Sequence, residues 1–239
     1  MQLVGVGRDA DVYALDGNRV LRRYRDAGKS AEREAAVMAY ARSAGLPVPE
    51  VFDVDGADLV MERVVGPTMT SALARRPWTL ASQARVLAGL HRAVHEVPAP
   101  DWLPVPGDGG GTALLHLDLH PDNVLLGAEG PVVIDWTNAA RGPAEVDVAD
   151  AWLVISAGSV PGGRLQAAVV GAAQGTFARL FRRAAGLDLA SALPAAAARR
   201  LADRNLGDRE RRRIRSLAGI REWPSHPNGD VDEHRPGGP

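Results

Sequence analysis

The first 65 residues alternate between short apolar runs and polar or glycine-containing turns, a pattern typical of a small antiparallel sheet. Turn signals at Asp16-Gly17-Asn18 and Asp55-Gly56 separate these runs. Pro47 and Pro49 favour an extended path into the fourth run. The expected elements are two strands in residues 4–15, a third at 19–24, a helix at about 30–44, a fourth strand entered through 45–52 and a fifth at 57–64.

From Gly66 onward the apolar positions recur with a helical period. Residues 80–95 form one apolar face, and a connector rich in Pro and Gly follows at 97–111. Further helices are expected from Ala144, over 164–185 and over 190–217, the last with Pro194 in its first turn and an interruption at Gly207. Residues 224–239 lack any apolar period and are expected to be disordered.

The pattern therefore predicts an α+β fold in two lobes, a small antiparallel β-sheet lobe with one helix at residues 1–65 and a mostly helical lobe at 66–223. A chain of 239 residues that is 46% hydrophobic is long enough to build a substantial core around a cleft.

Composition excludes several classes of function. The absence of cysteine excludes disulfides, thiol catalysis and thiolate metal sites. A net charge of -1 gives no general attraction to nucleic acid. No long apolar run or secretory leader is present, so we expect a cytoplasmic protein without membrane association. Lys29 is the only lysine, and such arginine-rich composition is typical of bacteria with GC-rich genomes.

Candidate chemistry is concentrated in residues 116–136. Asp118 is followed by Asn123 and then by Asp135, and the last two flank a predicted hairpin with its turn at 127–130. Phosphoryl transfer needs a carboxylate near the acceptor hydroxyl and oxygen ligands for magnesium. The protein-kinase template H-R-D-L-x-x-x-N followed by D-F-G has the same logic, but here Leu117 replaces the Arg and Trp136 the Phe.

Two other interpretations of these residues are open. His116, Asp118 and His120 alternate, so on a strand they would share a face and could bind a transition metal. Pro121 interrupts such a strand, and no cysteine or further histidine cluster adds ligands. The segment could also be a polar loop that caps two strands. His91 and His95 are four residues apart on a helix, where packing or surface roles are favoured over metal binding.

The segment from His116 to Trp136 resembles the aminoglycoside phosphotransferase and choline kinase-like family, whose motifs are H-x-D-x-x-x-x-N and I-D-W or I-D-F. The resemblance covers about residues 3–150, and Leu117 departs from the Gly often found there. It implies a bilobal protein kinase-like fold that binds ATP and Mg²⁺, with residues 1–65 as the nucleotide-binding lobe including the hinge. The partner it implies is a small hydroxylated substrate. The sequence carries no signal for the oligomeric state.

The resemblance also implies roles for individual residues. Asp118 would act on the acceptor hydroxyl, and Asn123 and Asp135 would hold magnesium. The turn at Gly5 and Gly7 would lie over the phosphates, where glycine allows close backbone approach. Taken alone, Gly-x-Gly also fits an ordinary hairpin, and no helix follows to support a Rossmann or Walker motif.

Arg22 departs from the family pattern, because relatives usually have Lys after the apolar pair on this strand. Arg22 would contact the phosphates, with Glu34 as its partner, although Glu34 could instead be a solvent-facing helix residue. Arginine can bind phosphate with two hydrogen bonds, but it is longer and planar. We therefore expect either a reshaped working site or a weakened one.

Three residues of the fifth strand would form the hinge by the same resemblance. The backbone carbonyl of Glu62 and the N–H of Val64 would bond the adenine edge, and Met61 would pack behind the base or simply fill the core. Asp147 is expected to cap a helix or to bond the catalytic loop, and His116 to brace that loop.

Charge distribution bears on the acceptor. Residues 1–143 carry 14 Lys/Arg and 18 Asp/Glu, whereas residues 144–223 carry 13 Arg and 8 acids. A polycationic aminoglycoside would favour an acidic wall, so another small hydroxylated metabolite is the preferred acceptor. The basic run at 199–215 could instead be a solvated helix face, and RNA binding is disfavoured because no aromatic residues interleave with it.

The function expected from these features is ATP-dependent transfer of the γ-phosphoryl group to a hydroxyl of a small molecule. Two alternatives remain. A nucleotide-binding pseudokinase would follow if Arg22 prevents turnover. A protein kinase is disfavoured because no Ala-Pro-Glu-like anchor follows Trp136.

Overall fold

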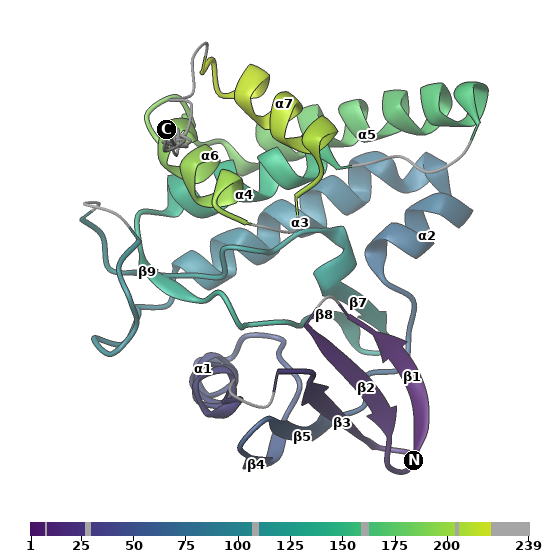
Figure 1. Cartoon of the computed structure of the whole chain (residues 1–239), viewed down its shortest axis with the longest axis vertical. Coiled ribbons are helices and arrows are strands. Elements are labelled where there is room, and N and C mark those ends of the chain that lie inside the picture. Colours follow the sequence, from purple (N-terminus) through teal and green to yellow (C-terminus); the bar gives the residue numbers. More distant parts are fainter. Residues whose placement is uncertain (8, 27–29, 107–109, 159–162, 204–205, 221–239) are drawn as a thin grey trace, which may run out of the picture.

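The computed structural model describes residues 1–7, 9–26, 30–106, 110–158, 163–203 and 206–220. The expected disordered tail at 224–239 and Lys29 lie outside these residues. Figure 1 shows a sheet with one helix at one end of the molecule and a group of helices at the other. The α+β, two-lobed architecture expected from the sequence is therefore confirmed.

The small lobe is a five-stranded antiparallel sheet with strand order β1-β2-β3-β5-β4. Its third strand buries Val20, Leu21, Arg22 and Tyr24, while Arg23 stays exposed. The strands are β1 (Gln2–Val6), β2 (Ala10–Ala14), β3 (Arg19–Tyr24), β4 (Val51–Asp55) and β5 (Asp58–Glu62). Strand β3 thus directs the Arg22 side chain into the molecule and the Arg23 side chain toward solvent.

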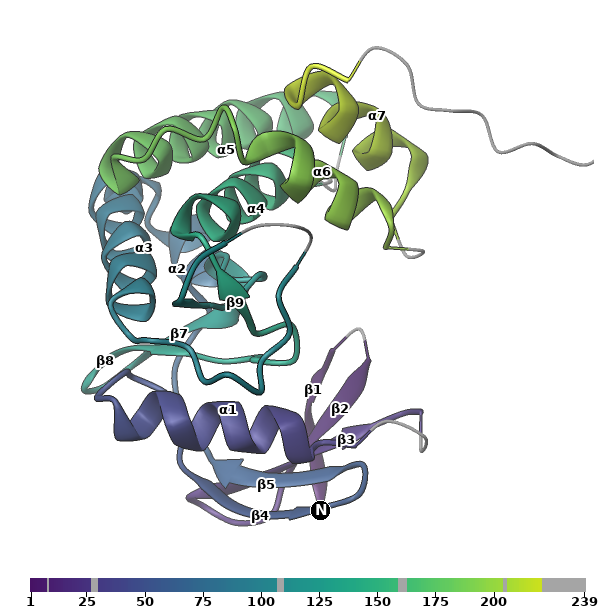
Figure 2. The same cartoon turned by 90° about the vertical axis from the view of Figure 1, so that its left-hand side faces the viewer.

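Helix α1 (Glu32–Ser43) packs between this sheet and the rest of the chain, as the turned view in Figure 2 shows. Its buried residues are Glu34, Ala35, Val37, Met38 and Ala41. Arg33 reaches across to donate a hydrogen bond to the carbonyl of Ala139, with a distance of 2.6 Å. The helix therefore contacts both lobes.

The large lobe is mainly helical. Its helices are α2 (Met69–Arg75), α3 (Leu80–His95), α4 (Ala144–Ala157), α5 (Arg164–Ala185), α6 (Leu193–Leu201) and α7 (Asp208–Leu217), with short 3-10 turns η1 (Pro77–Thr79) and η2 (Pro121–Asn123). The predicted helices at 80–95 and 164–185 have the observed bounds. The segment predicted as a helix at 190–217 with an interruption at Gly207 forms two helices, and Gly207 is the N-cap of the second. The interruption begins earlier than predicted, because α6 already ends at Leu201.

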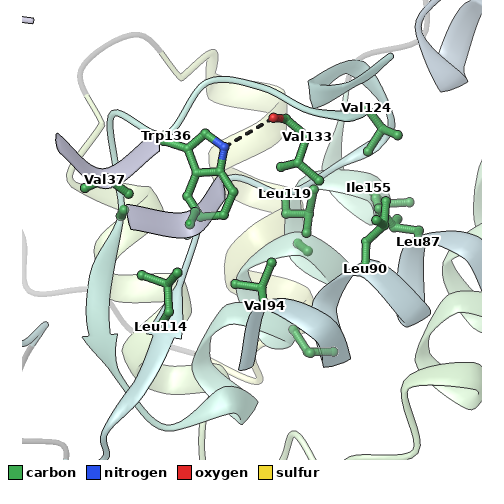
Figure 3. Packing of buried hydrophobic residues seen from close by; sticks show 14 of the residues in the cluster. Val37, Leu87, Leu90, Val94, Leu114, Leu119, Val124, Val133, Trp136 and Ile155 are labelled. Carbon is green, nitrogen blue, oxygen red and sulfur yellow. Dashed lines mark hydrogen bonds between the residues drawn. The ribbon is translucent and has the colours of Figure 1, made fainter. Parts of the chain in front are cut away.

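Two strand pairs complete this lobe. Strand β6 (Ala113–Leu115) pairs with β9 (Ala140–Gly142), and β7 (Val124–Gly127) pairs with β8 (Gly130–Val133) through a Gly127–Gly130 turn. The predicted hairpin is therefore confirmed. Figure 3 shows Val124 and Val133 in the core, and the indole N–H of Trp136 donates to the carbonyl of Val133.

The link between the lobes passes close to the hairpin. A Cβ at Gly66 would lie 2.1 Å from the carbonyl oxygen of Leu126, so only glycine fits there. The next residue, Pro67, accepts a hydrogen bond from the N–H of Leu126 at 2.9 Å. This close approach fixes the inter-lobe link against the strand that follows Asn123.

Within the described segments, every helix is too short or too polar to span a membrane.

Candidate active site

The loop that carries Asp118 is held by one buried carboxylate. Asp147, in the first turn of α4, is fully buried and accepts hydrogen bonds from the backbone N–H groups of His116 (3.2 Å) and Leu117 (2.6 Å). His95 Nε2 lies 2.8 Å from the same carboxylate. Although burial acts to raise it, hydrogen bonds from His91 and His95 hold the pKa of Asp147 well below its usual range. The expected bond to the catalytic loop is confirmed, whereas the N-cap is Pro143.

Leu117 adopts a left-handed backbone conformation with φ of 56°. This conformation costs a side-chain-bearing residue about 1–2 kcal/mol and favours glycine. The side chain is buried with Leu115 and Ala140, so packing and the bond to Asp147 compensate for the strain. A leucine in place of the glycine often found here in the family therefore acts on local packing.

Asp118 lies directly after Leu117, and its side chain is 19% exposed. The side-chain amide of Asn123 donates to the Asp118 backbone carbonyl (2.9 Å) and to Oδ2 of the Asp118 carboxylate (3.1 Å). On the other side, Nη2 of Arg200 donates to Oδ1 at 2.6 Å. Both carboxylate oxygens therefore already have a donor, and the side chain has a defined orientation.

Asp135 lies just beyond the hairpin, in a left-handed conformation with φ of 65°. Its Oδ1 accepts hydrogen bonds from Arg22 Nη2 and from the Thr137 hydroxyl, each at 2.9 Å. The N–H of Ile134 donates to the carbonyl of Asn123 at 3.0 Å, which joins the two ends of the hairpin. Burial acts to raise the pKa of Asp135, but the Arg22 guanidinium holds it below its usual range.

Glu34 is buried and is the second partner of Arg22, with a distance of 2.9 Å from Nη1 to Oε1. The Tyr24 hydroxyl and the backbone N–H of Trp136 also donate to its carboxylate. The pairing of Arg22 with Glu34 is therefore present, and the solvent-facing alternative for Glu34 is wrong. We call Arg22, Glu34 and Asp135 the Arg22 cluster.

The donor set at the hairpin fits a hard divalent cation. Magnesium prefers carboxylate and amide oxygens, and Asp135 and Asn123 supply one of each. Because the amide nitrogen of Asn123 donates to Asp118, the amide oxygen is the atom left to act as a ligand. The formal charge of the Arg22 cluster is -1, which also favours a cation there.

The remaining predicted nucleotide contacts lie along the sheet. Gly5 lies within β1 rather than in the turn, at a register shift opposite Val12, whereas Gly7 begins the hairpin and donates to the carbonyl of Ala10 at 2.8 Å. Met61 is 8% exposed and belongs to the core. Glu62 ends β5 and Val64 follows it beside Gly127. The core-filling interpretation of Met61 is supported, and the hinge contacts stay predictions.

The histidines do not form the transition-metal site considered for His116, Asp118 and His120. His116 is buried, its Nε2 lies 3.1 Å from the carbonyl oxygen of Ile134, and its ring contacts Trp136 at 4.7 Å. Burial lowers the pKa of His116, which suits a brace rather than a titrating group. Among the described residues, the group whose atoms could hold a metal is His91, His95 and Asp147.

That group is already used by the protein. His91 Nε2 lies 3.0 Å from the carbonyl oxygen of Leu119, and His95 bonds Asp147, which in turn holds the catalytic loop. His91 also stacks on Phe181. These contacts favour the packing role that the sequence suggested for the histidine pair.

Sequence reasoning missed a second arginine cluster, made of Arg199, Arg200, Asp150 and Asp118. The two arginines lie in the last turn of α6, where they could be interpreted as favourable charges at a helix end. Instead both bond the buried carboxylate of Asp150. The one available signal was Asp150 itself, an acid in the apolar run of α4 that requires a partner when buried. The solvated-face interpretation is wrong for these two arginines.

Comparison with known proteins adds independent support. The model of the phosphotransferase enzyme family matches residues 1–109 and 102–187. A comparison with curated proteins gives no significant match. The structure is similar to a thermostable mutant of aminoglycoside phosphotransferase APH(4)-Ia in a ternary complex with AMP-PNP and hygromycin B, with a TM-score of 0.65, 16% identity and coverage of 91% of this chain and 92% of the other.

Two further solved structures have the same fold. The streptomycin-ATP-APH(2")-IIa ternary complex matches with a TM-score of 0.60 and 14% identity over 83% of each chain. ADP-bound APH(2'')-Ib matches with a TM-score of 0.61 and 12% identity over 91% of each chain. The family model covers most of the chain, as the motifs at Asp118, Asn123 and Asp135 predicted. The chain therefore belongs to the phosphotransferase enzyme family and is a small-molecule phosphotransferase of the kinase type.

Proposed function

We propose that the protein transfers the γ-phosphoryl group of ATP to a hydroxyl group of a small molecule. The observation that carries this proposal is the meeting of Asp118, Asn123 and Asp135 at the junction of the lobes. Arg22 reaches this place from β3 and Glu34 from α1. Phosphoryl transfer depends on positioning and charge neutralisation, and these side chains supply both.

On the acceptor side, Asp118 receives a hydrogen bond from the substrate hydroxyl and orients it toward the phosphoryl group. The hydroxyl proton moves to the Asp118 carboxylate late in the reaction. The bond between Asn123 and Asp118 holds this carboxylate in place. Asp147 keeps the loop backbone rigid through two N–H bonds.

On the nucleotide side, Arg22 exchanges its bond with Asp135 for the phosphates of ATP while Glu34 keeps the guanidinium aimed at the site. Asp135 and Asn123 would hold magnesium, and the ion would supply positive charge that neutralises the transferred group. Gly5, Gly7, Met61, Glu62 and Val64 stay assigned to nucleotide binding, as predicted from the resemblance. Arginine in place of lysine is compatible with this role because its fork can bind two oxygens at once.

The neighbours that bind streptomycin or hygromycin B are less than 20% identical to this chain, so they support the fold and not the acceptor. The test is a screen of sugars, polyols, amino alcohols, nucleosides, macrolides and aminoglycosides for ATP-dependent ADP release. Phosphorus NMR of the product confirms transfer, and Asp118→Asn serves as the inactive control. Nucleotide binding without transfer to any compound or to water would favour the pseudokinase alternative.

A further inference from the structure

The Arg200 cluster, as we call Arg199, Arg200, Asp150 and Asp118, joins three segments of the large lobe. Asp150 on α4 is fully buried, and each of its oxygens is bound by one arginine of α6. Nε of Arg199 lies 3.0 Å from Oδ1, and Nε of Arg200 lies 2.9 Å from Oδ2. Both guanidinium groups also donate to the backbone carbonyl of Leu117. Asp150 thereby holds the two cations against the catalytic loop.

Arg200 extends this arrangement to Asp118. Its Nη2 donates to Oδ1 of Asp118 at 2.6 Å, and its side chain is only 11% exposed. Attraction from Asp150 and Asp118 exceeds the effect of burial and raises the pKa of Arg200, so the group stays charged. A fixed positive charge therefore lies at hydrogen-bond distance from Asp118, the residue that would accept a hydrogen bond from the acceptor hydroxyl.

The two sides of the site differ in charge. The Arg22 cluster has one cation and two carboxylates, whereas the Arg200 cluster has two of each and is neutral. The α5 and α6 sequences contain no acidic residue, so these helices add no carboxylate to the acceptor side. An ammonium group arriving here would compete with Arg200 for Asp118 and would be repelled by its guanidinium.

We propose that Arg200 selects the acceptor by charge, so that the substrate is a hydroxyl compound without an ammonium group near the reacting hydroxyl. This proposal rests on the proposed kinase function. The acceptor oxygen forms a bond to the γ-phosphorus, the bond from that phosphorus to the bridging oxygen of ADP breaks, and the hydroxyl proton passes to Asp118. Arg200 takes no proton and acts as a specificity-determining residue through its charge.

The test uses the full chain with ATP and magnesium. Hydroxyl compounds are offered in matched forms: sugars and polyols, their hydroxy-acid derivatives and their amino-substituted derivatives, with kanamycin as a polycation. The readouts are kcat/KM for ADP release, phosphorus NMR of the products and ADP release to water alone. Arg200→Gln removes the charge and Arg200→Lys keeps it. Arg199→Gln is the matched control because Arg199, within the part of the chain that the structure describes, bonds Asp150 and Leu117 and makes no hydrogen bond to Asp118. A thermal melt of each variant verifies folding.

We expect the wild-type protein to prefer the neutral or anionic form over its amino-substituted counterpart by at least about tenfold. Arg200→Gln should reduce this ratio toward one, whereas Arg200→Lys and Arg199→Gln should keep it even if their rates fall. A best acceptor that carries ammonium groups, or an unchanged ratio in Arg200→Gln, would overturn the proposal while leaving the kinase function intact. ADP release to water with no accepted compound in either form would overturn both. No ADP release under any condition would overturn the kinase function itself.

Discussion

The Arg22 cluster and the Arg200 cluster both position an arginine beside a functional aspartate, but they differ in net charge. In each, a buried acid fixes an arginine whose other nitrogen reaches a functional aspartate, Asp135 in the first case and Asp118 in the second. The buried acids differ in what else they bind. Glu34 accepts from Tyr24 and Trp136, whereas Asp150 accepts from a second arginine. One cluster is left with excess negative charge and the other is neutral.

This difference separates a cation-binding side from a side that does not attract cations. Under the proposed function, magnesium would be drawn to the carboxylate of the negatively charged cluster, which is Asp135. Asp118, already paired with Arg200, is left to bind a hydroxyl. One arginine with two acids in the first cluster, and two arginines with two acids in the second, therefore give the two halves of one site different ligand preferences.

The largest expected effect concerns the buried acids. Asp150→Asn removes the carboxylate that both guanidinium groups share, so that Arg199 loses its ion pair and Arg200 keeps only Asp118, and it should lower the free energy of unfolding by about 3–5 kcal/mol. Glu34→Gln should cost less, about 1–3 kcal/mol, because Arg22 keeps Asp135 and the amide can still accept a hydrogen bond. Urea denaturation measures both values. Asp58→Asn, which breaks the exposed pair with Arg23, is the control and should cost at most about 1 kcal/mol. Equal losses for Asp150 and Glu34 would mean that the second arginine adds nothing.

The next effect separates chemistry from binding. Asp118→Asn should cut turnover by at least about a hundredfold and leave nucleotide affinity unchanged, because the amide cannot take the hydroxyl proton. Steady-state kinetics and calorimetric titration with ATP measure the two quantities. Near-normal turnover in this variant would remove Asp118 from the base role.

Asp135→Ala, unlike Asp118→Asn, should change the binding of the nucleotide. Without this carboxylate, Asn123 offers one neutral oxygen, so the tightening of nucleotide binding by magnesium should disappear. Calorimetry with and without magnesium measures the change, and Asp118→Asn should keep the full magnesium effect. If Asp135→Ala kept it too, the cation would bind elsewhere and the contrast between the clusters would fail.

A smaller effect is expected at the sheet. Arg22→Ala should weaken ATP binding or slow turnover by about tenfold to a hundredfold, the range of one or two charge-assisted hydrogen bonds. Arg22→Lys should keep part of the function. Arg23→Ala should do little, because that side chain is exposed on the opposite face and bonds Asp58. Equal effects of Arg22→Ala and Arg23→Ala would contradict the assignment of Arg22 to phosphate binding. If no acceptor is phosphorylated and Arg22→Lys hydrolyses ATP faster than the wild-type protein does, the result would favour a pseudokinase.

The two clusters also differ in how far the sequence revealed them. Arg22 follows the apolar pair Val20-Leu21 on a predicted strand, and Asp118, Asn123 and Asp135 have a recognisable spacing, so local pattern was enough. The helices at 80–95 and 164–185 were predictable because apolar period and glycine punctuation agree, with Gly163 before α5 and Gly186 in left-handed geometry after it.

The Arg200 cluster could not be predicted by such means. Arg199 and Arg200 are about fifty residues from Asp150, and no spacing rule relates the end of one helix to the middle of another. The sequence predicted the break between α6 and α7 at Gly207, but this glycine marks only the start of the second helix, and α6 already ends at Leu201. The pairing of β6 with β9 likewise depends on contacts between short segments that carry no strong pattern of their own.

Leu117 gives the smallest and most specific test, because its backbone joins the Arg200 cluster to the buried carboxylate of Asp147. Its φ of 56° should make Gly more stable than Ala at position 117 by about 1–2 kcal/mol, once the leucine side chain is removed. At Leu115, a buried strand residue of the same small hydrophobic group, the Ala variant should be more stable than the Gly variant by about 0.5–1 kcal/mol. Urea denaturation of the four variants measures this change of sign. Ala exceeding Gly at both positions would show that the left-handed turn is not maintained, and with it would go the alignment of the Leu117 carbonyl with Arg199 and Arg200 that places a cation beside Asp118.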